Sequence, residues 1–281
     1  MRITTNVASL NAREANTNTS SKLNGSLEKL STGLRINKAS DDASGLAIAD
    51  KLRTQASSIK QGISNGNSAI SLLQIADKAM SEQSNILDVV KTKLAQANTD
   101  TTSDDGREAI RKDIVKLLTQ LDNIGKQTNY NGTQLISDTA GTAAATALTF
   151  QIGEGAGDTI SNTAINANTT GLALTGLTAL TTAGGLTKTL AGSEQANVDT
   201  AITTLNGFRG DVGSTQNQVE SAVRNLMTSH TNIKSAESVI RDVDYAEESA
   251  NFNKQNIIAQ AGAYALSQAN SVQQNVLRLL Q

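Results

Sequence analysis

The chain has 281 residues, enough for one or two domains. Its 24 Lys and Arg nearly balance 26 Asp and Glu, and the net charge of -2 excludes the strong, general attraction to nucleic acid that clustered cations give. No apolar run approaches the ~20 residues of a membrane helix, and residues 1–6 lack the apolar stretch of a cleavable secretory signal, so we expect neither membrane insertion nor signal cleavage.

The composition predicts long, uninterrupted helices. Proline, which breaks a helix interior by removing a donor and clashing with the preceding turn, is absent. Aromatic residues make up only 2% of the chain, too few for the wide core of a globular domain. Leu, Ile, Val and Ala instead suit the narrow seams between packed helices. The absence of cysteine fits either a reducing compartment or an exported chain.

The N-terminal segment, residues 1–35, is predicted to be an amphipathic helix. Leucines spaced by four, three and four residues form its apolar stripe: Leu23, Leu27, Leu30 and Leu34. The uncharged polar run at 16–21 stabilises an isolated helix poorly, so we expect disorder until another element packs against it. Residues 35–42 break the pattern and supply Ser or Asp caps for a new helix near Ala43.

Two long helices are predicted next, at about 43–98 and 107–128. The Thr-, Asp- and Ser-rich residues 99–106 are predicted to form the turn between them. Apolar residues recur in steps of three and four or in whole heptads, as in packed helical rods: Ile63, Ile70, Leu73, Met80, Leu87, Val90 and Leu94, then Ile110, Ile114, Leu117, Leu121 and Ile124.

The middle of the chain loses this register. Asn131 and Gly132 favour positive backbone dihedrals and predict a turn. Residues 149–152 alternate in polarity and precede a Gly-rich stretch, which predicts a strand and a hairpin turn. The low-complexity residues 160–192 are predicted to be irregular, with room for short strands.

Helix is predicted to resume near 193–196 and to continue to about 240 in the same register. A last amphipathic helix then reaches the C-terminus with its own apolar stripe: Ala261, Ala265, Ala269, Val272, Val276 and Leu279. An apolar stripe at each terminus is unusual, since chain ends normally fray in solvent. The two stripes can bury each other, and further copies of the chain can bury what stays exposed.

These patterns predict a mainly α fold: a long antiparallel helical bundle or coiled-coil rod with a small β-hairpin region and paired terminal helices. No nucleophile with a base and no ligand set stands out, so we expect no enzyme, no cofactor and no metal site. The single His230 cannot form a zinc pair alone. Gly153, Gly155 and Gly157 lack the Lys-Ser/Thr ending of a phosphate loop and favour a hairpin turn.

Blocks at both ends of the chain resemble the signatures of bacterial flagellins. Residues 30–49, LSTGLRINKASDDASGLAIA, resemble the N-terminal signature over some twenty consecutive positions. Further matching blocks lie at 129–132, 244–248, 260–262 and 268–280. The resemblance covers about residues 1–135 and 195–281, and matches in order at both ends make it specific.

The resemblance implies a structural subunit of the flagellar filament that is exported unfolded and self-assembles into a helical tube for motility outside the cell. Residues 1–43 and 241–281 are expected to form an inner tube domain, with the terminal stripes as its assembly interface. Residues 44–240 are expected to form a rod domain, with a hairpin at about 133–160. Because the chain is short, we expect only a small outward loop at about 160–192.

The implied partners are further copies of the chain, the flagellar export apparatus with its export chaperone, and the hook-associated junction and cap proteins. A hook–filament junction protein is the nearest alternative, since it shares the use of terminal helices in assembly. A soluble coiled-coil interaction module would also explain the heptads, but it would leave the two terminal stripes unexplained.

The linker between the two implied domains carries Arg35, Asn37, Lys38, Asp41 and Asp42. We expect these residues to pack against neighbouring subunits, where charges set register more than affinity. A solvated linker is the alternative.

Two positions depart from the family pattern. Gln273 stands where many flagellins have a proline, so we expect the last helix to continue unbroken. Val89 and Thr92 stand where the segment recognised by a Toll-like innate immune receptor usually carries an Arg and a Glu. We therefore expect this chain to activate that receptor weakly.

Overall fold

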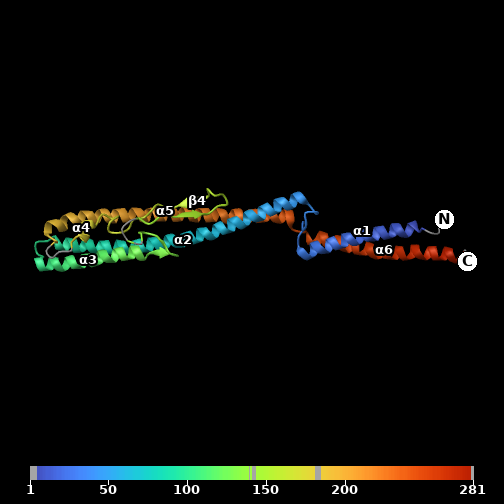
Figure 1. The fold of residues 1–281 in the computed structure, drawn as a ribbon, viewed down its shortest axis with the longest axis horizontal. Coiled ribbons are helices and arrows are strands. Elements are labelled where there is room, and N and C mark those ends of the chain that lie inside the picture. The colour runs from blue at the N-terminus through green and yellow to red at the C-terminus, as the bar shows by residue number, and fades with distance from the viewer. Residues whose placement is uncertain (1–4, 139, 141–143, 181–184, 280–281) are drawn as a thin grey trace. The chain divides into compact units, whose positions relative to one another are not determined.

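The computed structural model describes residues 5–138, 140, 144–180 and 185–279, the last range without the side chains of 273 and 276–279. It confirms the mainly α fold, with long helices and small antiparallel strand pairs (Figure 1). The chain forms two compact units, one made of Met1–Ala56 with Thr231–Gln281 and the other of Ser57–His230.

The long helices begin and end close to the predicted positions. Helix α2 spans Ala43–Ala97, in agreement with the prediction, and α3 spans Asp104–Gln127. Helix α3 begins three residues earlier than predicted because Ser103 caps it, its hydroxyl accepting a hydrogen bond from the Gly106 N–H at 3.2 Å. Asp104 and Asp105 then face the positive end of the helix dipole.

The Ser57–His230 unit has a continuous aliphatic core between α2, α3 and α5 (Lys188–Arg241). Fully burying such a side chain contributes about 1.5–3 kcal/mol. Leu118 is buried although the predicted seam left it out, and Leu117 is only half-buried. The core side chains exposed by 1% or less include Leu73, Met80, Leu87, Leu94, Ile114, Leu118, Leu121, Val198, Leu205 and Val212.

Two short hairpins follow α3, where the sequence predicts a turn at Asn131 and Gly132 and a single hairpin. Strands β1 (Asn129–Tyr130) and β2 (Thr133–Gln134) are joined by Asn131 and Gly132, whose φ angles of 51° and 82° suit a two-residue hairpin turn. Strands β3 (Thr149–Gln151) and β4 (Thr159–Ser161) pair antiparallel, with Phe150 opposite Ile160.

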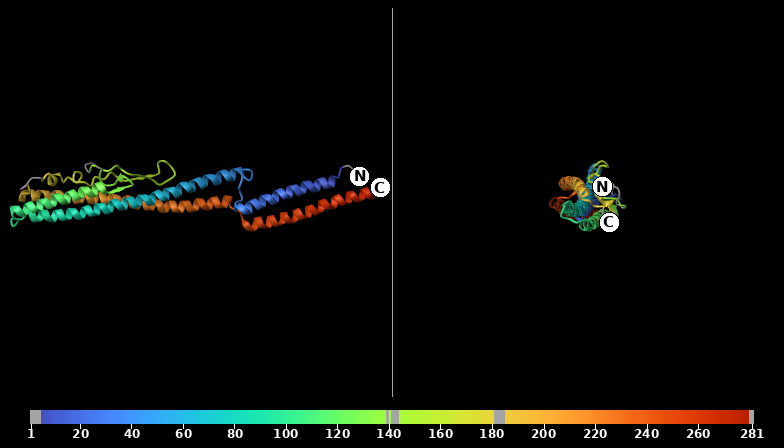
Figure 2. Two further views of the ribbon diagram at one scale, coloured as in Figure 1. Left: turned by 60° about the horizontal axis from the view of Figure 1, so that its bottom comes forward. Right: turned by 90° about the vertical axis from the view of Figure 1, so that its left-hand side faces the viewer.

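The segment expected to be a small outward loop packs on the helical core over its described part. It contains the short helix α4 (Thr175–Thr178) and buries five leucines: Leu172, Leu174, Leu177, Leu180 and Leu186. Figure 2 shows this segment running along the long helices of its unit. Helix α5 also begins earlier than predicted, at Lys188, because the Thr187 hydroxyl accepts from the Leu190 N–H at 3.2 Å.

In the other unit, α1 (Val7–Thr32) and α6 (Tyr245–Leu279) lie side by side and antiparallel (Figures 1 and 2). Asn6 caps the start of α1, where its side chain accepts from the Ser9 N–H at 3.1 Å. Helix α6 passes through residue 273 without a break, as predicted. None of the described helices combines the length and the apolarity that spanning a membrane requires.

Candidate functional site

The seam between α1 and α6 is built largely from small and polar residues. Its members recur in steps of three and four: Ala12, Asn16, Thr19, Leu23, Ser26 and Leu30 on α1, and Phe252, Gln255, Ala259, Gly262, Leu266 and Ala269 on α6. Ser26 is the one residue of α1 that is buried, and the Asn6 side-chain amide donates to the Ala269 carbonyl at 3.1 Å. The pair therefore buries little apolar surface for its length.

The predicted terminal stripes only partly coincide with this seam. Leu23, Leu30 and Ala269 lie in it, half-buried, whereas Leu27, Ala261, Ala265 and Val272 are exposed. Leu34 lies beyond the end of α1, in the linker, and is half-buried. Val276 and Leu279 are helical, but their side chains lie outside the described part of the chain.

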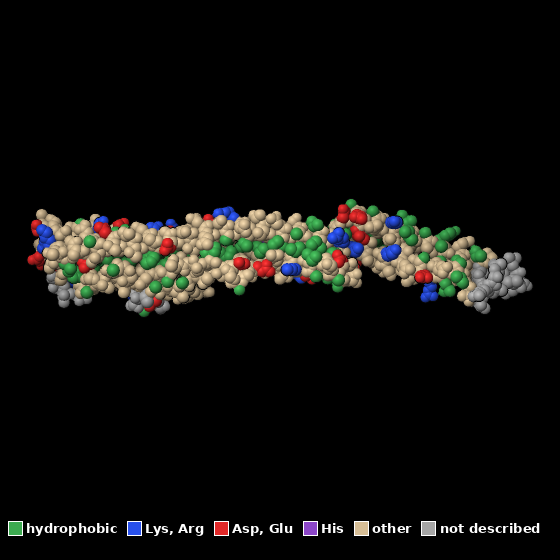
Figure 3. All heavy atoms as spheres, turned by 90° about the horizontal axis from the view of Figure 1, so that it is seen from above, with side chains coloured by type: hydrophobic (Ala, Val, Ile, Leu, Met, Phe, Trp, Pro, Cys, Tyr) green, Lys and Arg blue, Asp and Glu red, His purple; other side chains and the backbone are tan. Residues whose placement is uncertain are grey.

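The outer side of the helix pair carries large apolar side chains. On α6, Ile257, Ala261, Tyr264 and Val272 share a face opposite the seam, because their spacing of four, three and eight residues returns to one side of a helix. Ile257 is 67% exposed and Tyr264 75%. Val7, Leu10 and Leu27 are exposed on α1. Figure 3 shows hydrophobic side chains, in green, along the surface of these helices.

The linker between α1 and α2 crosses the linker between α5 and α6. The two segments pair as a short antiparallel bridge between Leu34 and Asp242. The Arg35 N–H donates to the Arg241 carbonyl at 2.6 Å, and the Val243 N–H donates to the Gly33 carbonyl at 3.0 Å. Four helix ends thus meet at one crossing.

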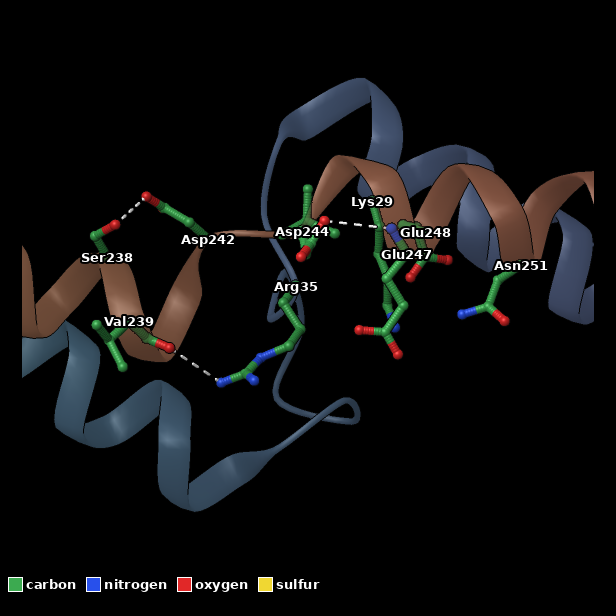
Figure 4. A pocket seen from close by; sticks show the side chains of 10 residues that line it. Lys29, Arg35, Ser238, Val239, Asp242, Asp244, Glu247, Glu248 and Asn251 are labelled. Carbon is green, nitrogen blue, oxygen red and sulfur yellow. Dashed lines mark hydrogen bonds between the residues drawn. The ribbon is translucent and has the colours of Figure 1, made fainter.

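Each of these helix ends has a dedicated partner. Gly33, with φ 73°, closes α1 in the left-handed conformation. The Arg35 guanidinium donates to the Ile240 carbonyl at 2.6 Å and to the Val239 carbonyl at 3.4 Å, so it caps the C-terminus of α5 (Figure 4). Asp42 accepts from the Ser44 and Gly45 N–H groups at the start of α2. Asp244 does the same for Ala246 and Glu247 of α6.

Glu28, near the end of α1, binds two residues of the linker between α1 and α2. It accepts from the Lys38 ammonium at 2.7 Å and from the Asn37 amide at 2.7 Å. The hydrogen bond from Lys38 holds the pKa of Glu28 below its ordinary value, and the same bond raises the pKa of Lys38. The backbone N–H groups of Lys38 and Asn37 donate to Asp41 and lower the pKa of that carboxyl.

The five linker residues singled out from the sequence thus all have partners inside the subunit. Their predicted packing against neighbouring subunits stays a prediction. Sequence reasoning missed Glu28 and Asp244. Asp244 precedes the predicted last helix and has the type of an N-cap, so this signal was available; nothing in the local pattern around Glu28 indicates its partners.

The described residues carry no obvious reaction centre. Within them, no group of three or more His, Asp or Glu side chains is placed to hold a metal ion. His230 lies half-buried on α5, and Asp158 closes the Gly-rich turn by accepting from the Gly155 N–H. A cavity of about 560 Å³ lies beside the linker crossing, lined by both acidic and basic side chains (Figure 4).

The two residues at the altered receptor-recognition positions lie on the outside of α2. Val89 is 44% exposed, and Thr92 is exposed, with its hydroxyl donating to the Asp88 carbonyl at 2.7 Å. Neither side chain is ionisable, so these two positions lack the charges that the family resemblance implies for them.

Comparison with known proteins gives matches at both ends and over the whole chain. Residues 3–142 match the family model for the bacterial flagellin N-terminal helical region, and residues 195–280 match that for the C-terminal helical region. Flagellin of Bacillus subtilis is 37% identical over 308 aligned residues that cover 100% of both chains. Flagellin A of Helicobacter pylori is 30% identical over 505 aligned residues, covering 99% of each chain.

Two solved structures are similar to parts of this fold. The crystal structure of Bacillus cereus flagellin covers 62% of this chain and 94% of its own, with a TM-score of 0.50 and 28% identity. A putative flagellar hook-associated protein from Vibrio parahaemolyticus covers 72% of this chain and 99% of its own, with a TM-score of 0.58. At 11% identity, this second likeness shows the fold alone.

Proposed function

The chain belongs to the bacterial flagellin family and is a structural subunit of the flagellar filament, and from that premise we propose how its terminal helices drive assembly. In this proposal α1 and α6 become stably folded only when neighbouring subunits cover the apolar faces that the pair leaves exposed. Family membership implies polymerisation; the surface responsible for it is our proposal.

The observation that carries the proposal is the contrast between the two sides of α6. Between Phe252 and Leu266, its seam with α1 contains only small and polar residues, whereas its opposite face exposes Ile257 and Tyr264. Ordering a residue costs about 1–2 kcal/mol in conformational entropy, and a seam with little apolar burial offsets that cost poorly. Burying each exposed Ile, Leu or Val on a neighbour adds about 1.5–3 kcal/mol.

We further propose that residues 1–43 and 241–281 form the inner tube of the filament and residues 44–240 its rod. The exposed face of α6 supports contacts between terminal helices of different subunits. The linker crossing supports a fixed connection rather than a flexible one, because Arg35, Asn37, Lys38, Asp41 and Asp42 are all engaged within the subunit.

The low stability proposed for the unassembled α1–α6 pair also suits export of the chain in an unfolded state. We propose that the chain leaves the cell unfolded through the flagellar export apparatus, with an export chaperone, and that junction and cap proteins contact the filament ends. A terminal helix pair that gains its main apolar contacts only after export suits such a route, since less structure has to be unfolded beforehand.

The test is a pair of charge substitutions on the exposed face of α6 in the full chain, Ile257→Glu and Tyr264→Glu. Both side chains are mostly exposed in the subunit, so circular dichroism should show unchanged helicity. Burying a carboxylate at a subunit contact costs well over the 1.4 kcal/mol that equals a tenfold effect. Seeded elongation should therefore slow by at least about tenfold.

Ser267→Glu is the matched control, because Ser267 is an exposed polar residue of α6 outside the apolar face. It should elongate at close to the parent rate. Normal elongation of both charge variants would show that this face is not the assembly surface.

The altered segment on α2 supports a second, narrower proposal: this flagellin activates the Toll-like receptor only weakly, because Val89 and Thr92 offer no charge there. Restoring the family residues with Val89→Arg and Thr92→Glu should raise the response of reporter cells. A parent response already as strong as that of a flagellin that keeps the charged pattern would refute this proposal.

A further inference from the structure

The chain contains four Asn-Gly pairs, and the structure places them in different backbones. A glycine after an asparagine leaves the next backbone nitrogen unshielded by a side chain. That nitrogen can reach the carbonyl carbon of the asparagine side chain only where the backbone between them is free to rotate. Three pairs lie inside the long helices α1, α2 and α5, and the fourth lies in the β1–β2 turn. In chain order the pairs are Asn24-Gly25, Asn65-Gly66, Asn131-Gly132 and Asn206-Gly207.

The pair Asn131-Gly132 lies at the exposed tip of the β1–β2 hairpin. Tyr130 pairs with Thr133, so the two residues between them lie outside the ladder. Both are exposed, and a Cβ atom added to Gly132 would meet nothing within 4 Å. The space around the Gly132 nitrogen is therefore open, and no packed side chain opposes a rearrangement of the turn.

Opening this turn disturbs little other structure. The ladder of the hairpin contains two residue pairs, and a two-stranded hairpin of that length is marginally stable in water. Local opening at such an exposed tip costs much less free energy than opening in the middle of a long, packed helix. The Gly132 nitrogen and the Asn131 side chain can thus come together while the rest of the unit stays folded.

The pair Asn206-Gly207 has the same exposure but a different backbone. Both residues are exposed on α5, and a Cβ atom on Gly207 would also meet nothing within 4 Å. The pair lies between the buried Leu205 and the half-buried Phe208, inside a helix of 54 residues. The Gly207 N–H points along the helix toward the carbonyl four residues earlier. Bringing its nitrogen to the Asn206 side chain therefore requires breaking the helix.

The pair Asn65-Gly66 is held at both of its reacting groups. The Asn65 side-chain amide donates to the Gln151 carbonyl at 3.0 Å, and its oxygen accepts from the Gln61 amide at 2.9 Å. Gly66 is buried, and a Cβ atom there would overlap the Val223 side chain. Neither group can move without disturbing the packing of α2 against its neighbours.

We propose that Asn131 is a site of spontaneous deamidation in the folded chain. The Gly132 backbone nitrogen loses its proton and forms a bond to the carbonyl carbon of the Asn131 side chain. The bond from that carbon to the side-chain nitrogen breaks, and the nitrogen leaves as ammonia with the proton. Water then adds to one of the two carbonyl carbons of the cyclic imide and opens it to aspartate or isoaspartate at position 131.

The modification changes both the charge and the backbone of the turn. Either product carries a negative charge where Asn131 is neutral, and isoaspartate also places the side-chain methylene in the main chain. Water does not reverse the loss of ammonia, so the modified fraction rises with the age of the subunit. The inference concerns a covalent change within one subunit and does not depend on how subunits assemble.

The test follows oxygen uptake by the unmodified full chain, kept unseeded in water enriched in oxygen-18 at mildly alkaline pH. Each deamidation brings one oxygen from water into the side chain or main chain of the reacting residue, and peptide fragmentation in a mass spectrometer locates it. The same measurement in guanidinium chloride gives the rate of each pair in the unfolded chain. Asn24 is left out of the comparison because we propose that α1 is unstable outside the filament.

The ratio of the folded to the unfolded rate should be at least about tenfold larger for Asn131 than for Asn65 and Asn206, because only the turn opens cheaply. Asn206 is the matched control for exposure. Asn129 is the control for the hairpin, since it is exposed on the same strand pair but precedes Tyr130 instead of a glycine. It should take up label much more slowly than Asn131.

Protection of Asn131 as strong as that of Asn206 would overturn the proposal, since it would show that the turn is no freer to react than the helix. Labelling of Asn129 as fast as that of Asn131 would also overturn it, because the reaction would then not depend on the Asn-Gly pair.

Discussion

At the scale of single residues, the end of α1 depends on the absence of a side chain at Gly33. Its φ of 73° is a conformation that costs other residues about 1–2 kcal/mol. A Cβ atom there would also lie 2.9 Å from the Tyr245 hydroxyl, at the start of α6. One glycine therefore lets α1 end and α6 begin next to each other.

Gly33→Ala should lower the free energy of unfolding of the assembled subunit by about 1–2 kcal/mol, measured by urea denaturation of filaments, in which α1 and α6 are stably folded. Gly25→Ala is the matched control in the interior of α1, where the added methyl meets nothing within 4 Å. That substitution should stabilise the helix by about 0.5–1 kcal/mol. Equal effects of the two substitutions would contradict the assigned role of Gly33.

The ion pair between Glu28 and Lys38 makes the linker sensitive to acid. Because the pKa of Glu28 is lowered in the folded chain, its stabilising effect is complete above the ordinary glutamate pKa of about 4.3 and is lost as the pH falls through the lowered pKa. The pKa of Asp41 is also lowered in the folded chain, so its stabilising effect is likewise lost as the pH falls through that lowered pKa.

Lys38→Met should raise the titration midpoint of the Glu28 carboxyl in assembled filaments, followed by carbon NMR between pH 2 and pH 6. Lys22→Met, on the exposed surface of the same helix, should leave that midpoint in place. An unchanged Glu28 midpoint in Lys38→Met would show that the ion pair does not exist in solution.

At the scale of elements, buried polar contacts hold the irregular segment after β4 against the helices. Gln83 of α2 is fully buried, and its side-chain amide donates to the Leu121 carbonyl of α3 at 3.1 Å and to the Ala167 carbonyl at 2.7 Å. Asp122 accepts from the N–H and the hydroxyl of Thr169 at 2.8 and 2.9 Å. These contacts connect α2, α3 and the segment.

Gln83→Met keeps the volume of the side chain and removes both donated bonds. The free energy of unfolding should fall by roughly 1–2 kcal/mol, and the Thr169 amide should exchange its hydrogen at least about tenfold faster. Gln74→Met, at an exposed position of α2, should change neither quantity. Unaltered exchange at Thr169 would mean that the segment is held without Gln83.

Heptad spacing was sufficient to predict α2 and the seams of the rod, because long periodic helices bury one face whatever their partners are. The segment at 160–192 was not predictable in the same way. Its leucines at 172, 174, 177 and 180 follow no single period, and Gln83, which holds Ala167, lies 84 residues away in sequence. Such contacts arise only from the tertiary fold.

In the candidate site, too, some features follow from the local sequence and others only from the tertiary fold. Caps such as Asp42 are local and follow from residue type and position. The local sequence of α6 does not determine which of its faces packs against α1. The helix carries apolar residues on more than one face, and only the packing of α1 decides which face is covered. The predicted stripe therefore mixes the exposed Ala261 and Val272 with the seam residue Ala269, and it does not contain Ile257 and Tyr264.

At the scale of the whole molecule, the two compact units differ in what holds them together. The Ser57–His230 unit has a continuous aliphatic core, whereas the seam of the α1–α6 pair consists largely of small and polar residues, and large apolar side chains are exposed on the outer side of the pair. We therefore propose that the Ser57–His230 unit folds alone and that the terminal helices become stably folded only in contact with other subunits.

The most direct test is seeded polymerisation of the full chain and of a chain lacking residues 1–35 and 245–281, viewed by negative-stain electron microscopy. The full chain should extend the seeds into filaments, and the shortened chain should stay helical by circular dichroism but form none. Filaments from the shortened chain, or a full chain that never extends the seeds, would contradict it.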